Sequence, residues 1–180
     1  VEALRQLVSE FSQFARMPKI KKSPADLVAL AADTLVLFQE GHKHIEFTLL
    51  VEHEIPIFDF DAEQIKRCLI NLLDNGVAVL PDGGKIDVEL TVNTFAQSVL
   101  LKVFDDGPGI SKEHKLRLFE PYFSTKKSGT GLGLAIVSTI VNDHGGYIRV
   151  QDNTPAGSVF TIELPLTNNS GYAQRGSDFS

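Results

Sequence analysis

Two glycine clusters, separated by a short basic and hydroxyl-rich segment, constrain the fold of this chain more than any other stretch. The first, Gly107-Pro108-Gly109, comes after an apolar run over residues 98–104 that predicts a strand, and directly after the acidic pair Asp105-Asp106. The second, Gly129-Thr130-Gly131-Leu132-Gly133, opens into an apolar pattern with helical spacing. Glycines before a helix let backbone N–H groups approach an anion, and the helix N-terminus adds its positive dipole end. The pattern therefore predicts a phosphate site, with ordinary glycine turns as the alternative.

Composition limits the kind of protein this can be. With 180 residues, the chain is long enough for one domain with a real core. Its formal net charge of −6 argues against general nucleic-acid binding. The one cysteine, Cys68, excludes an internal disulfide and fits a reducing compartment. No apolar run approaches the ~20 residues that span a bilayer, and no signal peptide is present. We therefore expect a cytoplasmic domain.

The order of patterns predicts four segments. Residues 1–17 have an amphipathic helical pattern that begins in full register at Val1, which predicts a fragment of a longer chain. This helix either packs on its own domain or is the end of a bundle helix whose partners lie upstream. A basic stretch over residues 19–22 predicts a linker, and residues 23–166 carry the folded domain. The polar, glycine- and serine-rich residues 167–180 predict a disordered tail.

Within the folded domain, helices and strands are mixed in order. Ser23 as N-cap and Pro24 at the first helical position predict a helix that ends at Gly41, and Asp61 with Gln64 predicts a second helix over residues 62–80. A third helix is expected over residues 132–144. Strands are expected over residues 45–51, 57–60, 85–92, 97–104, 147–151 and 158–164. This order predicts an α+β fold with one mixed sheet and helices on one face.

Three polar side chains stand out within apolar surroundings. Asn71 and Asn75 are four residues apart, so both amides project from one face of the predicted helix. They are either ordinary amides satisfied at the helix surface or ligands for a polar group, and a carbonyl oxygen suits magnesium. Asp105 ends a strand and precedes a glycine turn. Its carboxylate either accepts a hydrogen bond from an exocyclic amine such as that of adenine or caps the turn.

These motifs, in this order, resemble the GHKL superfamily, and in particular the ATP-binding domain of bacterial sensor histidine kinases. The resemblance rests on Asn71-x-x-x-Asn75, Asp105-x-Gly107-x-Gly109, Phe119-Glu-Pro-Tyr-Phe123 and Gly129-Thr-Gly131-Leu-Gly133, and it covers about residues 23–166. The segment LVSEFSQFARMP resembles the end of the second helix of the dimerisation and phosphotransfer hairpin in such kinases. Together with the short stretch PYFSTKKSGTGLGLAIV, it is most similar to the nitrogen-regulation sensor kinases.

The resemblance implies a two-layer α/β sandwich of the Bergerat type, with an ATP lid between about Ser111 and Thr130. Asp105 would bind the adenine amine, and Asn75 would give its side-chain oxygen to Mg²⁺. Asn71 and Lys126 are the implied catalytic residues, with Lys127 as the alternative lysine for the terminal phosphates. The full set implied for ATP binding is Asn71, Asn75, Asp105, Gly107, Gly109, Ile110, Phe119, Thr130, Gly131, Leu132, Gly133 and Leu134.

The sequence departs from the family pattern in two places. Hydrolytic GHKL members such as gyrase carry glutamate at the position of Asn71, and an amide cannot take a proton from water, which favours transfer to a protein side chain. After Asn75 the family usually continues with alanine and a basic residue, whereas this chain reads Gly76-Val-Ala-Val79. Glycine costs roughly 1 kcal/mol of helix propensity, and the missing positive charge removes one expected phosphate contact.

No histidine has the sequence context of the family's phosphoacceptor. His53-Glu54-Ile55-Pro56 resembles its beginning, but it lies between strand segments, and Pro56 is incompatible with a helix there. We therefore expect a catalytic domain that holds ATP and transfers its γ-phosphate to a histidine on a dimerisation domain, for relay to a response regulator. The intact protein is expected to be a homodimer anchored in a membrane, and this fragment a monomer. The alternatives are a GHKL ATPase that drives conformational change and a nucleotide-free regulatory module.

Overall fold

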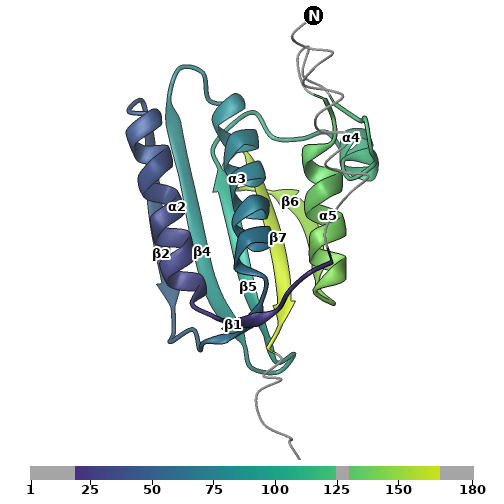
Figure 1. Cartoon of the computed structure of the whole chain (residues 1–180). Coiled ribbons are helices and arrows are strands. Elements are labelled where there is room, and N and C mark those ends of the chain that lie inside the picture. The colour runs from purple at the N-terminus through teal and green to yellow at the C-terminus, as the bar shows by residue number, and fades with distance from the viewer. Residues whose placement is uncertain (1–18, 125–129, 167–180) are drawn as a thin grey trace, which may run out of the picture.

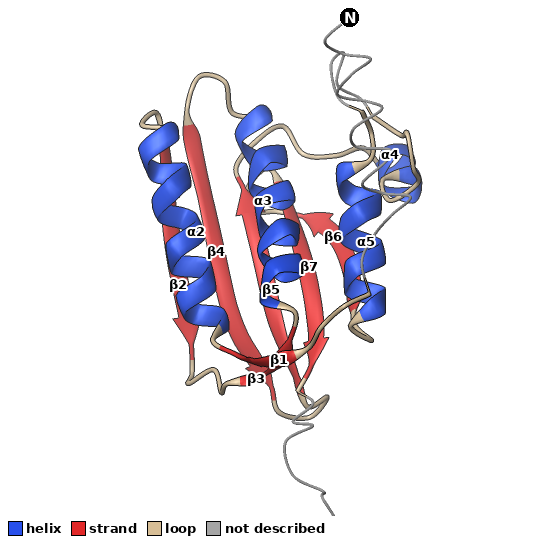
Figure 2. Cartoon of the chain, in the orientation of Figure 1, coloured by secondary structure: helices blue, strands red, loops and turns tan. Residues whose placement is uncertain are grey.

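The computed structural model describes residues 19–124 and 130–166, which form two layers (Figure 1). One layer is a five-stranded sheet in the order β2-β4-β5-β7-β6, and the helices α2, α3 and α5 cover one of its faces (Figure 2). The predicted α+β fold with a mixed sheet is confirmed. The helix expected over residues 1–17, the tail over residues 167–180 and Lys126 all lie outside the described residues.

The strands give the sheet a mixed pattern. β2 pairs with β4 in parallel, and the remaining neighbours are antiparallel. Alternate side chains of the central strands β4 and β5 are buried under the helices, as a sheet covered on one face requires. The strand bounds are β2 Ile45–Glu52, β3 Phe58–Phe60, β4 Gly84–Asn93, β5 Ser98–Asp105, β6 Tyr147–Asp152 and β7 Ser158–Pro165.

The predicted start of the first helix is wrong. Residues Ser23–Ala25 form a strand, β1, which pairs antiparallel with β3 at the lower ends of α2 and α3 (Figure 2). Helix α2, Leu27–Gly41, begins three residues later than expected, because the side chain of Asp26 accepts the N–H of Ala29 at 3.0 Å and acts as the N-cap. Both Ser23 and Asp26 suit an N-cap, and pairing with β3 decides between them.

The second predicted helix has the expected start. Helix α3, Ala62–Ala78, is capped by Asp61, whose side chain accepts the N–H of Gln64 at 3.1 Å. One side of the helix is fully buried against the sheet, through Ile65, Cys68, Leu69, Leu72 and Leu73. Asn71 and Asn75 lie on the side of the helix next to this buried face, and both are half-buried.

Two helices follow the hairpin of β4 and β5. Helix α5, Gly133–Asp143, lies beside α3 on the sheet (Figure 1) and matches the prediction to within one residue at each end. Helix α4, Lys112–Arg117, was not predicted. It contains six residues, has no buried side chain, and is capped by Ser111, whose hydroxyl accepts the N–H of His114. In the part of the chain that the structure describes, no helix has the length and apolar character needed to span a bilayer.

Candidate functional site

Asp105 lies at the last position of β5, in a buried and hydrogen-bonded setting. Its side chain is 6% exposed, and Oδ1 accepts the backbone N–H groups of Gly107 at 3.0 Å and Ser158 at 3.3 Å. Burial raises the pKa of the Asp105 carboxyl, the two N–H groups oppose that shift, and the charge of Asp106 adds to it. Both hydrogen bonds end on Oδ1, so Oδ2 takes no part in capping the turn. The turn-capping role is therefore compatible with the predicted contact of this carboxyl group with a ligand.

A second turn holds the end of β5 in place. The carbonyl of Asp105 accepts the side-chain amide of Asn153 at 2.9 Å, and a Cβ on Gly157 would stand 1.8 Å from that same carbonyl oxygen. Gly109, at φ +77°, lies against the backbone of Gly157. Only glycine fits at residue 157, because its φ is +102° and its Cα packs directly on β5. The glycine turn after Asp105 is thus supported by the turn between β6 and β7, which the sequence did not reveal.

Asp106, the neighbouring acidic residue, has a different role. Oδ1 of Asp106 accepts the N–H of Lys85 at 2.8 Å, and the Asp106 N–H donates to the Lys85 carbonyl at 3.3 Å. These bonds join the end of β5 to the start of β4. Of the two acids in the motif, Asp106 therefore joins the two strands, and Asp105 remains the candidate for binding a ligand.

Helix α3 brings the two asparagines to this end of the sheet. A Cβ on Gly76 would stand 3.9 Å from the Cβ of Asp105, so Asn75 lies one residue from the contact between α3 and β5. Asn75 and Asn71 are both half-buried. The side-chain amide of Asn71 donates to the carbonyl of Arg67 at 3.0 Å, one helical turn earlier. Its Oδ1 faces α5, where a Cβ on Gly133 would stand 2.9 Å away.

The glycines of the second cluster bring backbone groups close together at the start of α5. Gly131 has φ +70°, and a Cβ there would stand 2.5 Å from the carbonyl carbon of Tyr122. The carbonyl of Gly131 also accepts the N–H of Tyr122 at 3.0 Å, so the described residues on either side of the undescribed segment are joined. Leu132, the N-cap residue, makes no side-chain hydrogen bond to the first turn of α5. The N–H groups of that turn are therefore suited to an anion.

The remaining predicted site residues are buried or half-buried where the structure describes them. Leu132 is fully buried, and Ile110, Phe119 and Leu134 are half-buried and pack against the core. Phe123 is half-buried, with the guanidinium of Arg117 4.8 Å from its ring centre. Thr130 is half-buried at the start of the cluster. Lys126, Lys127 and Gly129 lie outside the described residues, so their predicted roles stay predictions.

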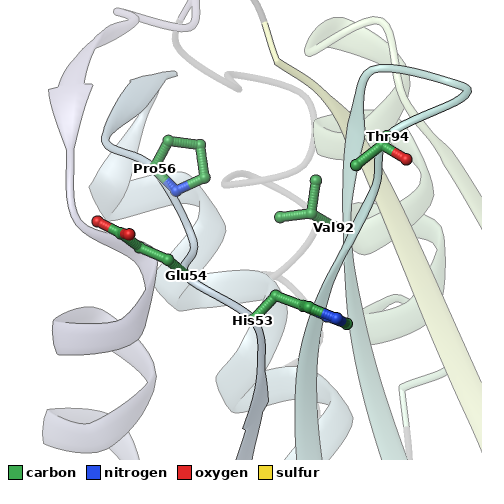
Figure 3. Close-up of a pocket in the computed structure, with 5 residues that line it drawn as sticks. All are labelled: His53, Glu54, Pro56, Val92 and Thr94. Carbon is green, nitrogen blue, oxygen red and sulfur yellow. The ribbon is translucent and has the colours of Figure 1, made fainter.

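A separate pocket lies far from these residues. It is lined by His53, Glu54, Pro56, Val92 and Thr94 (Figure 3). On β4, Ile86 pairs with Asp105, and Val92 is six residues further on, or about 20 Å along the strand. His53 therefore belongs to the opposite end of the sheet, which supports the prediction that it is not the phosphoacceptor.

The donor chemistry suits a nucleotide carrying magnesium. Among the described residues, no three His, Cys, Asp or Glu side chains converge to hold a metal ion. A divalent cation here would have amide oxygen, phosphate oxygen and water as ligands, which is a set that Mg²⁺ accepts. The side chain of Asn75 fits such a set. The arrangement thus offers a buried carboxyl group for a base, an amide oxygen for a metal, and a helix N-terminus for phosphates.

Comparison with known proteins agrees with this arrangement. Residues 60–168 match the family described as histidine kinase-, DNA gyrase B- and HSP90-like ATPase. The chain is 36% identical over 166 residues to the nitrogen regulation protein NtrY of Azorhizobium caulinodans, covering 89% of this chain and 21% of NtrY. It thus spans about a fifth of the length of that relative.

Solved structures give the same result. The catalytic domain of histidine kinase ThkA superposes with a TM-score of 0.75 at 34% identity, covering 81% of this chain and 96% of that one. Full-length ShkA in complex with AMPPNP gives a TM-score of 0.81 at 27% identity, covering 92% of this chain and 36% of that one. ThkA in complex with the response regulator TrrA gives a TM-score of 0.79 at 29% identity, covering 92% of this chain and 48% of that one. The chain therefore belongs to the histidine kinase-, DNA gyrase B- and HSP90-like ATPase family, as a catalytic domain of the sensor histidine kinase kind.

Proposed function

We propose that this chain binds ATP with Mg²⁺ at the end of the sheet where α3, β5 and α5 meet. We further propose that it transfers the γ-phosphate to a histidine on a dimerisation domain, from which a response regulator takes it. The observation that carries the proposal is that Asp105, Asn75 and the start of α5 converge, through the contacts of Gly76 with Asp105 and of Asn71 with Gly133. The ShkA complex with AMPPNP and the ThkA complex with TrrA support the two halves of this proposal.

Each group has a role that its position supports. Oδ2 of Asp105 accepts the exocyclic amine of adenine, and the turn over residues 107–109 closes around the base. The first turn of α5, to which Leu132 gives no side-chain hydrogen bond, donates to the phosphates. Asn75 would hold Mg²⁺, which would supply positive charge beside the phosphates while the γ-phosphoryl group passes from the β-phosphate to the acceptor nitrogen.

Asn71 favours transfer over hydrolysis. Its amide cannot accept a proton from water, and its nitrogen is already donating to the Arg67 carbonyl. Its oxygen lies against Gly133, where it positions the start of α5. An ATPase of this family that drives conformational change would need a general base to activate water, and Asn71 cannot supply one.

The test has two stages. Calorimetric titration with ADP and Mg²⁺ should give saturable one-to-one binding, and loss of binding in the folded chain would contradict the proposal. In the second stage, labelled ATP is added to the chain together with a separately produced dimerisation domain from the same kinase. Label on the histidine of that domain, with slow release of free phosphate, is the expected result. Rapid phosphate release without labelled histidine would identify an ATPase instead.

A further inference from the structure

A buried histidine joins α3 and α5 at the end of the helices opposite the candidate nucleotide site. His144 follows α5 directly and is 2% exposed. Its Nε2 accepts the backbone N–H of Asp61, the N-cap of α3, at 3.0 Å, and its Nδ1 lies 2.7 Å from the carbonyl oxygen of Ile140. Because Nε2 accepts, the proton of the neutral ring is on Nδ1, which donates to Ile140.

The residues before β1 are attached at the same point. The N–H of Lys21 donates to Oδ2 of Asp61 at 2.8 Å, and the ammonium of Lys22 donates to the carbonyl of His144 at 3.0 Å. A cation at the C-terminal end of a helix also interacts favourably with the helix dipole. One small network therefore joins the segment 19–22 to the start of α3 and the end of α5.

The two ends of the helix pair are in matched register. Asn71 contacts Gly133 at the nucleotide end, and Asp61 contacts His144 at the other. Along α3 the two contacts are ten residues apart, or about 15 Å, and along α5 they are eleven residues apart, or about 16.5 Å. The helices therefore run antiparallel, joined at both ends. A helix is stiff over this length, so a shift at the Asp61–His144 contact moves Gly133 relative to Asn71.

We propose that His144 is a positioning residue for the nucleotide site: its neutral ring fixes α5 against α3 and so sets how the phosphate-facing end of α5 meets Asn71. The effect of His144 on nucleotide affinity rests on the proposed function, because Asn71 and the start of α5 are among the groups proposed to bind ATP. Through Lys21 and Lys22, the same contact connects the segment before β1 to that geometry. A change in this segment then alters nucleotide affinity without touching the nucleotide.

The contact is sensitive to protonation. An imidazolium would place an N–H on Nε2 against the N–H of Asp61, and the two donors would separate. The charged groups that face the ring are Lys22, Asp61 and Asp143. Burial lowers the pKa of His144 below its ordinary value and Lys22 lowers it further, while the Ile140 carbonyl, Asp61 and Asp143 oppose the shift. The contact is therefore intact at neutral pH and is lost as pH falls through this lowered pKa.

Two variants separate the role of Nε2 from that of burial. In His144→Gln, the side-chain oxygen occupies the region of Nε2, still accepts the Asp61 N–H, and does not titrate. In His144→Asn, the shorter amide still donates to Ile140 but does not reach Asp61. His53→Gln removes an exposed histidine that contacts neither helix and serves as the control. The nucleotide-free chains are compared by ¹H–¹⁵N NMR from about pH 8 to about pH 5, following the Gly133 amide and the Asn71 side-chain amide.

In the wild type and in His53→Gln, both signals should move as His144 becomes protonated, toward their positions in His144→Asn. In His144→Gln they should stay fixed. At low pH, ADP should bind the wild type roughly fivefold more weakly than it binds His144→Gln, and the two should agree at high pH. Should His144→Asn fail to fold, the comparison of the wild type with His144→Gln still shows whether protonation of His144 moves the two signals.

Two results would overturn the proposal. Unchanged Gly133 and Asn71 signals across the titration of the wild type would confine the effect to the Asp61 end. Identical titration of the wild type and His144→Gln would assign the effect to another group. Failure of all variants, including the wild type, to bind ADP would instead refute the proposed function, and the nucleotide-free spectra would still decide the role of His144.

Discussion

Replacement of Asp105 by asparagine tests the base-binding role directly, because asparagine has nearly the same shape and differs at one oxygen. Oδ1, which accepts the N–H groups of Gly107 and Ser158, is retained in the variant. Oδ2 becomes an NH₂ group, which would point a donor at the donor amine of adenine. The change therefore removes one hydrogen bond to a charged group and leaves a buried donor without an acceptor.

The expected loss follows from these two terms. A hydrogen bond to a charged group contributes about 1.5–3 kcal/mol, and a buried donor without a partner costs about 1–3 kcal/mol. Their sum, about 3–6 kcal/mol, corresponds to a loss of roughly two to four powers of ten in affinity for ATP and ADP. Calorimetric titration with ADP and Mg²⁺ should detect little or no binding by Asp105→Asn.

The fold should not suffer from this change. Because burial raises the pKa of Asp105 above its unfolded value, its contribution to stability is complete at pH below the unfolded value and is lost as pH rises through the folded value. Asparagine does not ionise, so at neutral pH the variant should be at least as stable as the wild type. Cys68 provides a check, because burial raises the pKa of its thiol to about 12 and it stays unreactive toward iodoacetamide while α3 is packed.

The matched control is Asp106→Asn. It removes the adjacent charge but keeps the oxygen that accepts the N–H of Lys85. ADP affinity should stay within about threefold of the wild type, since this group lies on the β4 side and does not face the base. Wild-type affinity in folded Asp105→Asn would refute the assignment, and so would an equal loss in both variants.

Three further predictions concern the metal, the phosphoacceptor and the packing of α3. Asn75→Ala should weaken binding of Mg²⁺·ATP much more than binding of ATP in excess chelator, and equal losses by calorimetry would exclude the metal role. The chain incubated alone with labelled ATP should not acquire label, and an acid-labile label that disappears in His53→Gln would identify that residue as an acceptor. Gly76→Ala should lower the free energy of unfolding less in an Ile86→Val background than in the wild type, because a Cβ at residue 76 would stand 2.8 Å from the Ile86 Cδ1, which valine lacks. Additive effects of the two substitutions on the free energy of unfolding would contradict this reasoning.

Local rules predicted the long elements of this fold. Asp61 with Gln64 marked the start of α3 because a cap and an amphipathic run agree there, and the structure has the same cap. At Ser23 the local rule failed, since two cap residues three apart were both acceptable and strand pairing with β3 selected the later one. Helix α4 was missed because its six residues bury no side chain and so carry no periodic apolar signal, although its Ser111 cap was readable.

The sequence indicated the candidate residues of the site but not the contacts that hold them. Asn71 and Asn75 were chosen because amides in an apolar run need partners, and Asp105 because it ends a strand before a glycine turn. The turn that holds Asp105, through Asn153 and Gly157, lies about fifty residues away, and nothing local indicates that the two turns meet. His144 was equally invisible, because its role depends on Asp61, which is 83 residues distant.

Gly76, where the family usually has alanine, has a physical reason in the fold. As a residue within a helix it lowers stability, by roughly 1 kcal/mol relative to alanine, and the stretch 76–79 that it begins is the best support for a nucleotide-free module. In the fold, Gly76 is where α3 approaches the sheet, with Ile86 and Asp105 directly opposite. The missing side chain lets α3 lie close to β5 and brings Asn75 to the end of the strand that carries Asp105. The glycine therefore favours the convergence on which the proposed nucleotide binding depends, and Gly76 by itself does not argue for a nucleotide-free module.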